Sequence, residues 1–234
     1  PGVALAAGDE QIVLVHANFA ELAGELDALG IAEVDGVLFD FGVSSMQLDR
    51  AERGFSFQTD GPLDMRMNST GGRTARELLE TIDEPELTEI LATFGEDRAA
   101  RRIARAILAA RARGALPNRT NELARLVAGA VQRRGTRERI HPATRTFQAL
   151  RIAVNDELSA IERGLDAACA RTRVGGRIVA ISFHSLEDRI VKRRFRDDER
   201  LRVLTKKPLG AGDAERATNP RARSAKLRAA ERVA

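Results

Sequence analysis

The residues best suited to chemistry in this sequence stand at the ends of apolar runs. Asp40 ends the run Val34–Phe39, and Ser44 lies in the loop behind it, while His184 follows a second run at Arg177–Ser182. A carboxylate, a hydroxyl and an imidazole can hold or move protons, and ligands of open α/β sheets bind beyond the carboxyl ends of the strands. The sequence therefore predicts a ligand site at such an edge. Taken alone, Asp40 would equally suit a strand-end turn, and His184 a capping role.

Other kinds of site lack their signature in the sequence. The three histidines and the single cysteine, Cys169, lie far apart and show no metal-ligand spacing. No Gly-rich phosphate loop and no nucleophile elbow is present. We therefore expect no metal and disfavour NTPase and serine-hydrolase functions. One cysteine indicates a reducing, cytoplasmic setting, and no apolar run approaches the length of a membrane span.

Alternating strands and helices are predicted to hold the site. Residues 12–15 form a β-branched run, and apolar residues at helical spacing follow a plausible N-cap at Asn18 before the run that ends at Asp40. Strand, helix and strand at this spacing predict a βαβ unit with parallel strands. Residues 42–73 form an irregular loop, which at that length is usually functional.

Helical patterns fill the middle of the chain. Three apolar stripes in succession predict a helical domain inserted at 74–140. A long helix is expected after Pro142, with its apolar stripe reaching Leu165. A strand at 177–182 precedes another helix, for which Ser185 is the expected N-cap. Residues 201–205 and 225–233 are candidate strands of a terminal hairpin.

The charge distribution suggests a polyanionic partner. Of the 38 basic residues only four are lysines, and Tyr and Trp are absent. Residues 1–64 hold 2 basic and 12 acidic residues, whereas residues 189–234 hold 15 basic and 6 acidic ones. A basic segment of this kind favours nucleic acid. Codon usage in a G+C-rich genome would equally place arginine on every solvated face, and composition alone does not separate the two explanations.

Several long motifs carry a more specific signal. They are DFGVSSMQLD at 40–49, RAERGFSF at 50–57, DGPLDMRM at 60–67, HPATRTFQALRI at 141–152, SFHSLEDR at 182–189 and NPRARS at 219–224. In this order they resemble the bacterial ribosomal small-subunit methyltransferase H family, and the resemblance covers nearly the whole chain.

The resemblance implies a fold and a reaction. The fold would be α/β: a class I, Rossmann-like S-adenosylmethionine-dependent methyltransferase sheet, with strand order 3-2-1-4-5-7-6 and an inserted all-helical domain. Residues 1–73 and 141–234 would form the methyltransferase domain, and 74–140 the insertion. The reaction would move a methyl group from S-adenosylmethionine to N4 of the cytidine at position 1402 of 16S ribosomal RNA, so the partner would be the small ribosomal subunit.

The motif match also implies roles for single residues near the first strands. Phe19, Asp40 and Gln47 correspond to cofactor contacts of the family. The amine of cytosine is a poor nucleophile, because its lone pair is delocalised into the ring, so a nearby acceptor would help to remove a proton. Asp40 and Ser44 are the candidate catalytic residues, with Asp40 expected chiefly to bind and position the donor.

Four residues are candidates for RNA contact. Arg145 lies near the start of its helix, and His184 stands at the same sheet edge as Asp40. Arg221 and Arg223 belong to the basic end of the chain. An enzyme reaches a base amine only in a flipped or single-stranded nucleotide, so such contacts are needed to hold the strand.

The chain also departs from the family. The family's Gly-rich cofactor loop and first two strands have no counterpart in this sequence. Between Arg196 and Leu201 the family usually has a longer segment, and only residues 197–200 stand there in this sequence. Two alternatives therefore stay open, namely a catalytically incomplete RNA-binding or ribosome-assembly module and another class I amine methyltransferase. A homodimer also stays open.

Overall fold

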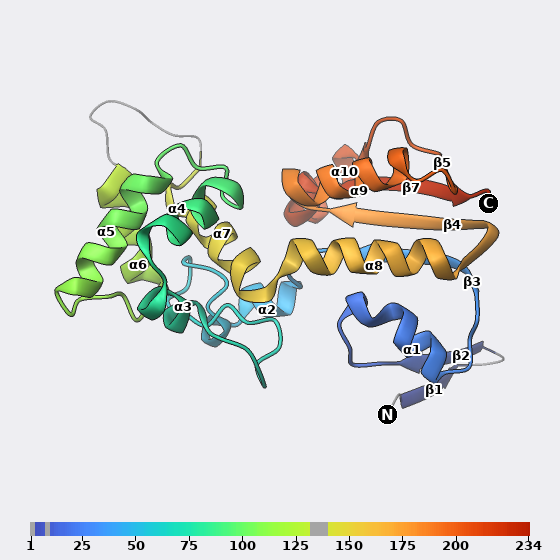
Figure 1. Cartoon of the computed structure of the whole chain (residues 1–234), viewed down its shortest axis with the longest axis horizontal. Coiled ribbons are helices and arrows are strands. Elements are labelled where there is room, and N and C mark those ends of the chain that lie inside the picture. Colours follow the sequence, from blue (N-terminus) through green and yellow to red (C-terminus); the bar gives the residue numbers. More distant parts are fainter. Residues whose placement is uncertain (1–2, 8–9, 132–139) are drawn as a thin grey trace. The chain divides into compact units, whose positions relative to one another are not determined.

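The computed structural model describes residues 3–7, 10–131 and 140–234. They form two compact units (Figure 1). The first unit comprises Pro1–Gly42 and Leu158–Ala234, and the second comprises Val43–Glu157. No helix in the described part of the chain is long and apolar enough to cross a membrane.

The first unit is built on a mixed sheet. Its strands are β3 (Val34–Asp40), β4 (Thr172–Ser182), β5 (Leu201–Val203), β6 (Leu209–Gly210) and β7 (Lys226–Arg232). The order is β3-β4-β7-β5, and β6 also pairs with β7. β3 and β4 run parallel, whereas β7 is antiparallel to β4 and β5. This arrangement matches the 4-5-7-6 half of the expected strand order, and the predicted terminal hairpin of β5 and β7 is confirmed.

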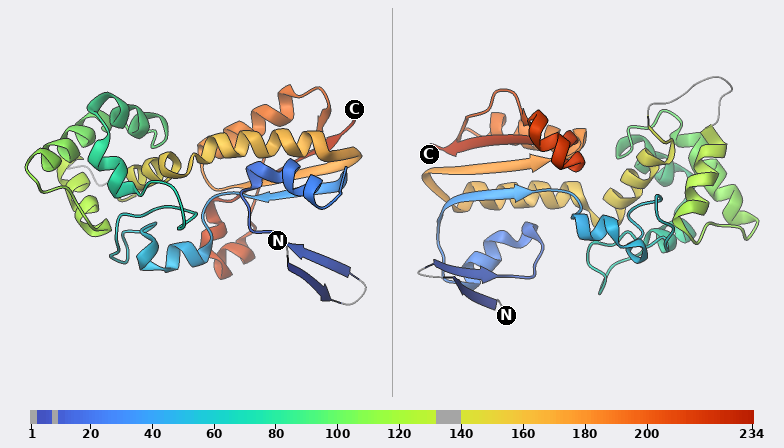
Figure 2. Two further views of the ribbon diagram at one scale, coloured as in Figure 1. Left: turned by 60° about the horizontal axis from the view of Figure 1, so that its bottom comes forward. Right: turned by 180° about the vertical axis from the view of Figure 1, so that it is seen from behind.

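Two helices contribute to the core of this unit. α8 (Glu157–Arg171) lies alongside β4 in the views of Figures 1 and 2, and α9 (Ser185–Asp197) follows β4 directly. Their apolar side chains form one buried cluster with Phe39 of β3 and Ile178 of β4. Leu38, on the opposite face of β3, is 67% exposed, so the core lies on the Phe39 side of this strand. The smaller helices are η1 (Phe19–Glu21), α1 (Leu22–Ala28), α10 (Asp213–Thr218) and η3 (Pro220–Ser224).

The predicted parallel βαβ unit at the start of the chain is wrong. β2 (Glu10–Leu14) pairs antiparallel with β1 (Val3–Ala7) in a separate two-stranded sheet, and not with β3. Runs close together in sequence can pair antiparallel, whereas a parallel partner needs a long crossover connection. β3 finds its parallel partner in β4 instead, through a connection that contains the whole second unit.

The second unit is helical. Its buried apolar cluster draws on the stripes predicted from periodicity, with Leu87, Ile103, Ile107 and Leu123 fully buried. The helices are α2 (Ser45–Asp49), η2 (Ala51–Arg53), α3 (Ala75–Thr81), α4 (Glu84–Thr93), α5 (Ala100–Ala112), α6 (Thr120–Val131) and α7 (Ala143–Asn155).

The loop before these helices packs into the same core. Leu63 and Met65 are buried in the helical cluster, and Pro62 forms an isolated β-bridge with Arg119. α7 joins the same cluster through Phe147. The compact unit therefore starts at Val43 rather than at residue 74, because the loop supplies apolar side chains to the helices. The division into functional domains stays a prediction.

The single long helix expected after Pro142 is two helices. α7 ends at Asn155 and α8 starts at Glu157, because Asp156 adopts a left-handed conformation with φ 48°. Asp and Asn adopt this conformation more readily than other residues with a Cβ. The apolar periodicity continues across Asp156, so the sequence pattern does not reveal that the helix is interrupted at this residue.

Candidate functional site

The candidate site of the first unit lies where β3 and β4 end together. Asp40, the last residue of β3, is paired with Ile181, and the N–H of Phe41 donates to the carbonyl of Ile181 at 3.0 Å. Because the strands are parallel, the segment after β4 emerges at the same edge as Asp40. The predicted shared edge of Asp40 and His184 is therefore confirmed.

A buried carboxylate organises this edge. Glu187, in the first turn of α9, is fully buried, and its Oε2 accepts the backbone N–H groups of Phe183 at 2.7 Å and His184 at 3.2 Å. Two donors at the helix start are thus satisfied by one charged acceptor, as in a capping box. His184, and not the expected Ser185, is the N-cap residue, and Ser185 is the first residue of the helix.

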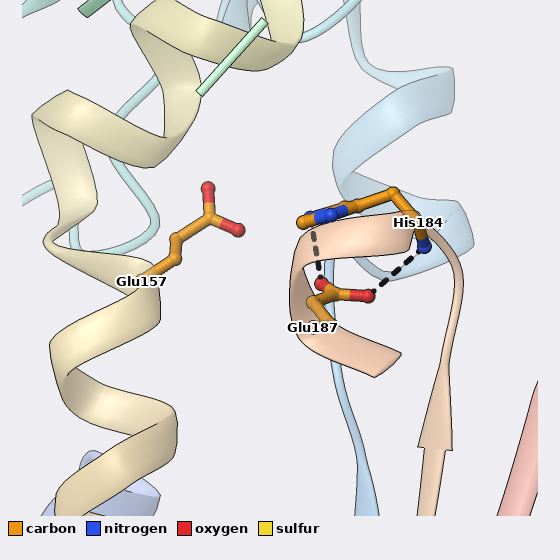
Figure 3. Close-up of side chains that lie close together, drawn as sticks. All are labelled: Glu157, His184 and Glu187. Carbon is orange, nitrogen blue, oxygen red and sulfur yellow. Dashed lines mark hydrogen bonds and ion pairs between the residues drawn. The ribbon is translucent and has the colours of Figure 1, made fainter. Parts of the chain in front are cut away.

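The His184 side chain lies against the same carboxylate. Its Nε2 is 3.1 Å from Oε1 of Glu187, as Figure 3 shows. Neither ring nitrogen makes a hydrogen bond within the described residues, although the side chain is only 12% exposed. Buried polar atoms normally have partners, so an imidazole with one ion-pair contact and no hydrogen bond in the described residues is suited to a bound molecule. Figure 3 also draws Glu157, which belongs to the second unit and there accepts two hydrogen bonds from Arg151.

An aromatic cluster borders the edge. The ring of Phe19 lies 5.4 Å from that of Phe41 and 5.9 Å from that of Phe39, between centroids. Gly164 of α8 makes room for it, because a Cβ there would lie 2.8 Å from the Phe19 ring. Asn18 holds the turn by accepting the N–H of Ala20. Phe19 remains 37% exposed, so part of an apolar ring faces solvent close to the end of β3.

The electrostatics of the edge centre on Asp40. Partial desolvation raises the pKa of the Asp40 carboxyl above its usual range, and the negative charge of Glu187 raises it further. Gly42 brings the loop after β3 close to the Glu187 carboxylate, since a Cβ at position 42 would lie 3.7 Å from its Oε1. Its φ of +86° also favours glycine. A more basic carboxylate is a better proton acceptor near neutral pH.

Comparisons with known proteins agree with this architecture. Residues 3–233 match the model of the MraW methylase family. The chain belongs to the MraW methylase family. A protein of Geobacter sulfurreducens named ribosomal RNA small subunit methyltransferase H is 53% identical, with 98% of this chain and 79% of that protein covered. Proteins of the same name from Deinococcus deserti and Sorangium cellulosum are 52% and 53% identical, with 97% and 98% of this chain and 74% and 72% of their own lengths covered.

Two of the predicted site residues of this methylase form a local pair in the second unit. Ser44 is the N-cap of α2; its Oγ accepts the N–H of Gln47, and Oε1 of Gln47 accepts the N–H of Ser44. This capping box fixes both side chains. The amide nitrogen of Gln47 takes no part in the box, so it can still donate to a ligand. Their assignment to the catalytic and cofactor sites stays a prediction.

The predicted RNA contacts of the methylase lie in both units. Arg145 is exposed on α7 and donates to the carbonyl of Glu96 at 3.1 Å. Arg221 and Arg223 flank the buried Ala222 in η3 of the first unit, and both are exposed. In the first unit, Phe19, Asp40 and His184 lie at the carboxyl ends of β3 and β4. Arg221 and Arg223 come shortly before β7, whose first residue, Lys226, pairs with Ser182 at the end of β4, whereas Arg145 belongs to the second unit.

Sequence reasoning missed the part that Glu187 plays. An acid in the first turn of a helix ordinarily just complements the helix dipole. The available signal was its position three residues after His184, which is the spacing of a capping box. Sequence alone did not show that the carboxylate would be fully buried and close to both His184 and Asp40.

Proposed function

We propose that this methylase transfers a methyl group from S-adenosylmethionine to N4 of the cytidine at position 1402 of 16S ribosomal RNA in the small ribosomal subunit. Family membership and the names of its relatives support an RNA methyltransferase. The observation that carries the assignment is the grouping of Phe19, Asp40 and His184 at one sheet edge of the first unit. Such a substrate would place the reaction in the cytoplasm.

The residues at the edge fit S-adenosylmethionine. A half-exposed aromatic ring at Phe19 can cover an adenine face, and the Asp40 carboxylate can accept hydrogen bonds from ribose hydroxyls or an ammonium group. When bound, the cofactor supplies a methyl group on a positively charged sulfur, and the sulfur keeps the electron pair of the broken carbon–sulfur bond.

The protein's own residues hold and deprotonate the amine. N4 of cytosine forms the new nitrogen–carbon bond with its lone pair, and one N4 proton must then leave. We assign Asp40 to position the donor and to accept hydrogen bonds at this edge, and its raised pKa also suits it to receive that proton. His184, whose ring nitrogens make no hydrogen bond within the described residues, would contact the flipped nucleotide. Ser44 is the other candidate acceptor.

Methyl transfer to defined RNA tests the proposal. Protein is incubated with isotopically labelled S-adenosylmethionine and with either 30S particles or free 16S rRNA that lacks the modification. The RNA is digested, and its nucleosides are identified by mass spectrometry. We expect N4-methylcytidine in one fragment. A methyl group on another cytosine atom, or no labelled RNA at all, would refute the assignment.

A matched pair of variants tests the role of Asp40. Asp40→Ala should lose both methyl transfer and cofactor binding in calorimetry, because it removes the acceptor at the edge. Asp35→Ala, on the same strand and with a side chain 86% exposed, should behave like the wild type. Unchanged cofactor affinity in Asp40→Ala would contradict the binding role.

The need for a metal ion and the number of subunits can each be tested directly. We propose that a metal ion is not needed, so activity should survive chelation with EDTA. The sequence left a homodimer open, and light scattering on the purified protein decides between monomer and dimer.

A further inference from the structure

A groove with a volume of about 630 Å³ lies on the second unit. Five arginines line it, and Asp97 is the one acidic residue in its described lining. The arginines are Arg98, Arg101, Arg102, Arg105 and Arg145, and all five are exposed. Its walls include the starts of α5 and α7 and the end of α6, so the groove is formed within one compact unit.

The periodicity of α5 explains why the charges gather. Its buried stripe contains Ala100, Ile103 and Ile107, at helical spacing. Arg101 and Arg105 are four residues apart on the other side of the helix. A helix rises 1.5 Å per residue, which places these two side chains about 6 Å apart along the axis. The arginines therefore form a row along the groove, suited to successive charges of a polymer rather than to one small ion.

Little of this charge is neutralised. Glu84 is shared by Arg105 at 2.8 Å and Arg101 at 3.6 Å. Arg102 donates to the carbonyl of Val131, and Arg145 to that of Glu96, and neither contact supplies a negative charge. Arg98 has no ion pair within the described residues. Like charges three or four residues apart repel each other, so this arrangement of arginines does not stabilise the helix.

A second hollow in the first unit shows what an ordinary arginine-rich surface looks like here. Five acidic and three basic side chains line it. Arg194 pairs with Asp166 and Asp198, and Arg200 pairs with Asp198. Abundant arginine in the sequence therefore does not by itself produce unpaired positive charge. The groove of the second unit differs because its five arginines converge where, within the described residues, Glu84 is the one carboxylate that forms ion pairs with them.

We infer that this arginine groove binds the phosphodiester backbone of RNA. Guanidinium groups suit phosphate oxygens through paired N–H donors, and backbone contacts position a strand without reading its bases. The inference rests on the proposed function, since rRNA is the polyanion that this methylase would meet. It names a second contact surface, on the helical unit, besides the edge that holds Asp40.

Filter binding with an unmodified 16S rRNA transcript tests the groove. The test variant is the full chain with Arg98→Gln and Arg145→Gln. The control carries Arg113→Gln and Arg125→Gln, which remove the same charge from exposed positions of the same unit outside the groove lining. Circular dichroism melting shows that both variants fold.

Salt dependence gives the quantitative readout. Each lost phosphate contact lowers the slope of log K against log salt by about 0.7–0.9, so the groove variant should lose about 1.4–1.8 of slope. We also expect affinity for RNA to fall about tenfold or more near 0.1 M salt. The control should keep the wild-type slope. A groove variant with the wild-type slope, or a control that loses as much, would overturn the inference.

Two further measurements separate the outcomes. Displacement of RNA by a few millimolar inorganic phosphate at constant ionic strength would show a small-anion site and would overturn the assignment to a polymer. Calorimetry should show unchanged affinity for S-adenosylmethionine in the groove variant. If the wild type forms no N4-methylcytidine while the groove variant still weakens RNA binding, the proposed function fails and the groove stands. If the variant methylates with an unchanged KM for rRNA, the groove fails alone.

Discussion

Replacing Glu187 tests how the edge of the sheet is held. Its Oε2 accepts two backbone N–H groups, at 2.7 and 3.2 Å, from a fully buried position. A hydrogen bond to a charged group is worth about 1.5–3 kcal/mol, and a partly buried donor left without its acceptor also loses part of its solvation. Because the bond from His184, at 3.2 Å, contributes less than the shorter one, we expect Glu187→Ala to lower the free energy of unfolding by about 3–5 kcal/mol. That is a large part of an ordinary folding free energy.

The assay must be local, because the chain has no Trp or Tyr and consists of two units. Hydrogen exchange followed by mass spectrometry resolves the peptide that contains Phe183 and His184. Their amides should lose protection in Glu187→Ala and largely keep it in Glu187→Gln, which retains an acceptor oxygen. Glu33→Ala, at an exposed position, is the control for removing a carboxylate.

The same variants report on Asp40. Removing the charge of Glu187 should lower the raised pKa of Asp40, because that charge is one of its two causes. Carbon-13 NMR titration of the Asp40 carboxyl measures the change in Glu187→Gln. Unchanged amide protection in Glu187→Ala, together with an unchanged pKa of Asp40, would show that Glu187 neither holds these amides nor raises the pKa of Asp40.

Three other sites give predictions of their own. Burial raises the pKa of the Cys169 thiol to about 11, so iodoacetamide at pH 8 should label it only after unfolding, and rapid labelling of the native protein would contradict this. Arg200 holds the pKa of Asp198 at about 2, so Asp198 stabilises the fold above pH 3.8, and this contribution is lost as the pH falls toward 2. Asp198→Asn should therefore lower the melting temperature at pH 7 and progressively less below pH 3.8. Arg228→Met should lower the free energy of unfolding in urea by about 1–3 kcal/mol, because the partly buried Asp188 carboxylate then keeps only Lys226, at 3.7 Å, as an ion-pair partner within the described residues. Asp188→Leu added to it should recover much of the loss, and an equally unstable double variant would count against a buried ion pair.

Local patterns predicted most of the elements. The apolar stripes of α4, α5 and α6 appear in the sequence because each helix buries one face, and the strand β4 appears as a β-branched run. The strand-end positions of Asp40 and His184 were also predictable, since parallel strands share a carboxyl edge.

What the sequence did not predict depends on single residues and on distant partners. The sequence of residues 12–15 favours an extended strand, but it does not show which strand will pair with it. In the structure the partner is β1. The break between α7 and α8 rests on one φ angle at Asp156. The burial of Glu187 depends on side chains contributed by other elements, which no local spacing reveals.

The row of arginines on α5 has a consequence for how this methylase responds to salt. Positive charges three and four residues apart repel by about 0.2–0.5 kcal/mol per pair, and dissolved ions screen that repulsion. A higher salt concentration should therefore stabilise the helical unit while it lowers the affinity for RNA. Stability and affinity would move in opposite directions along one experimental variable, as in other proteins that give up some folding energy where they bind.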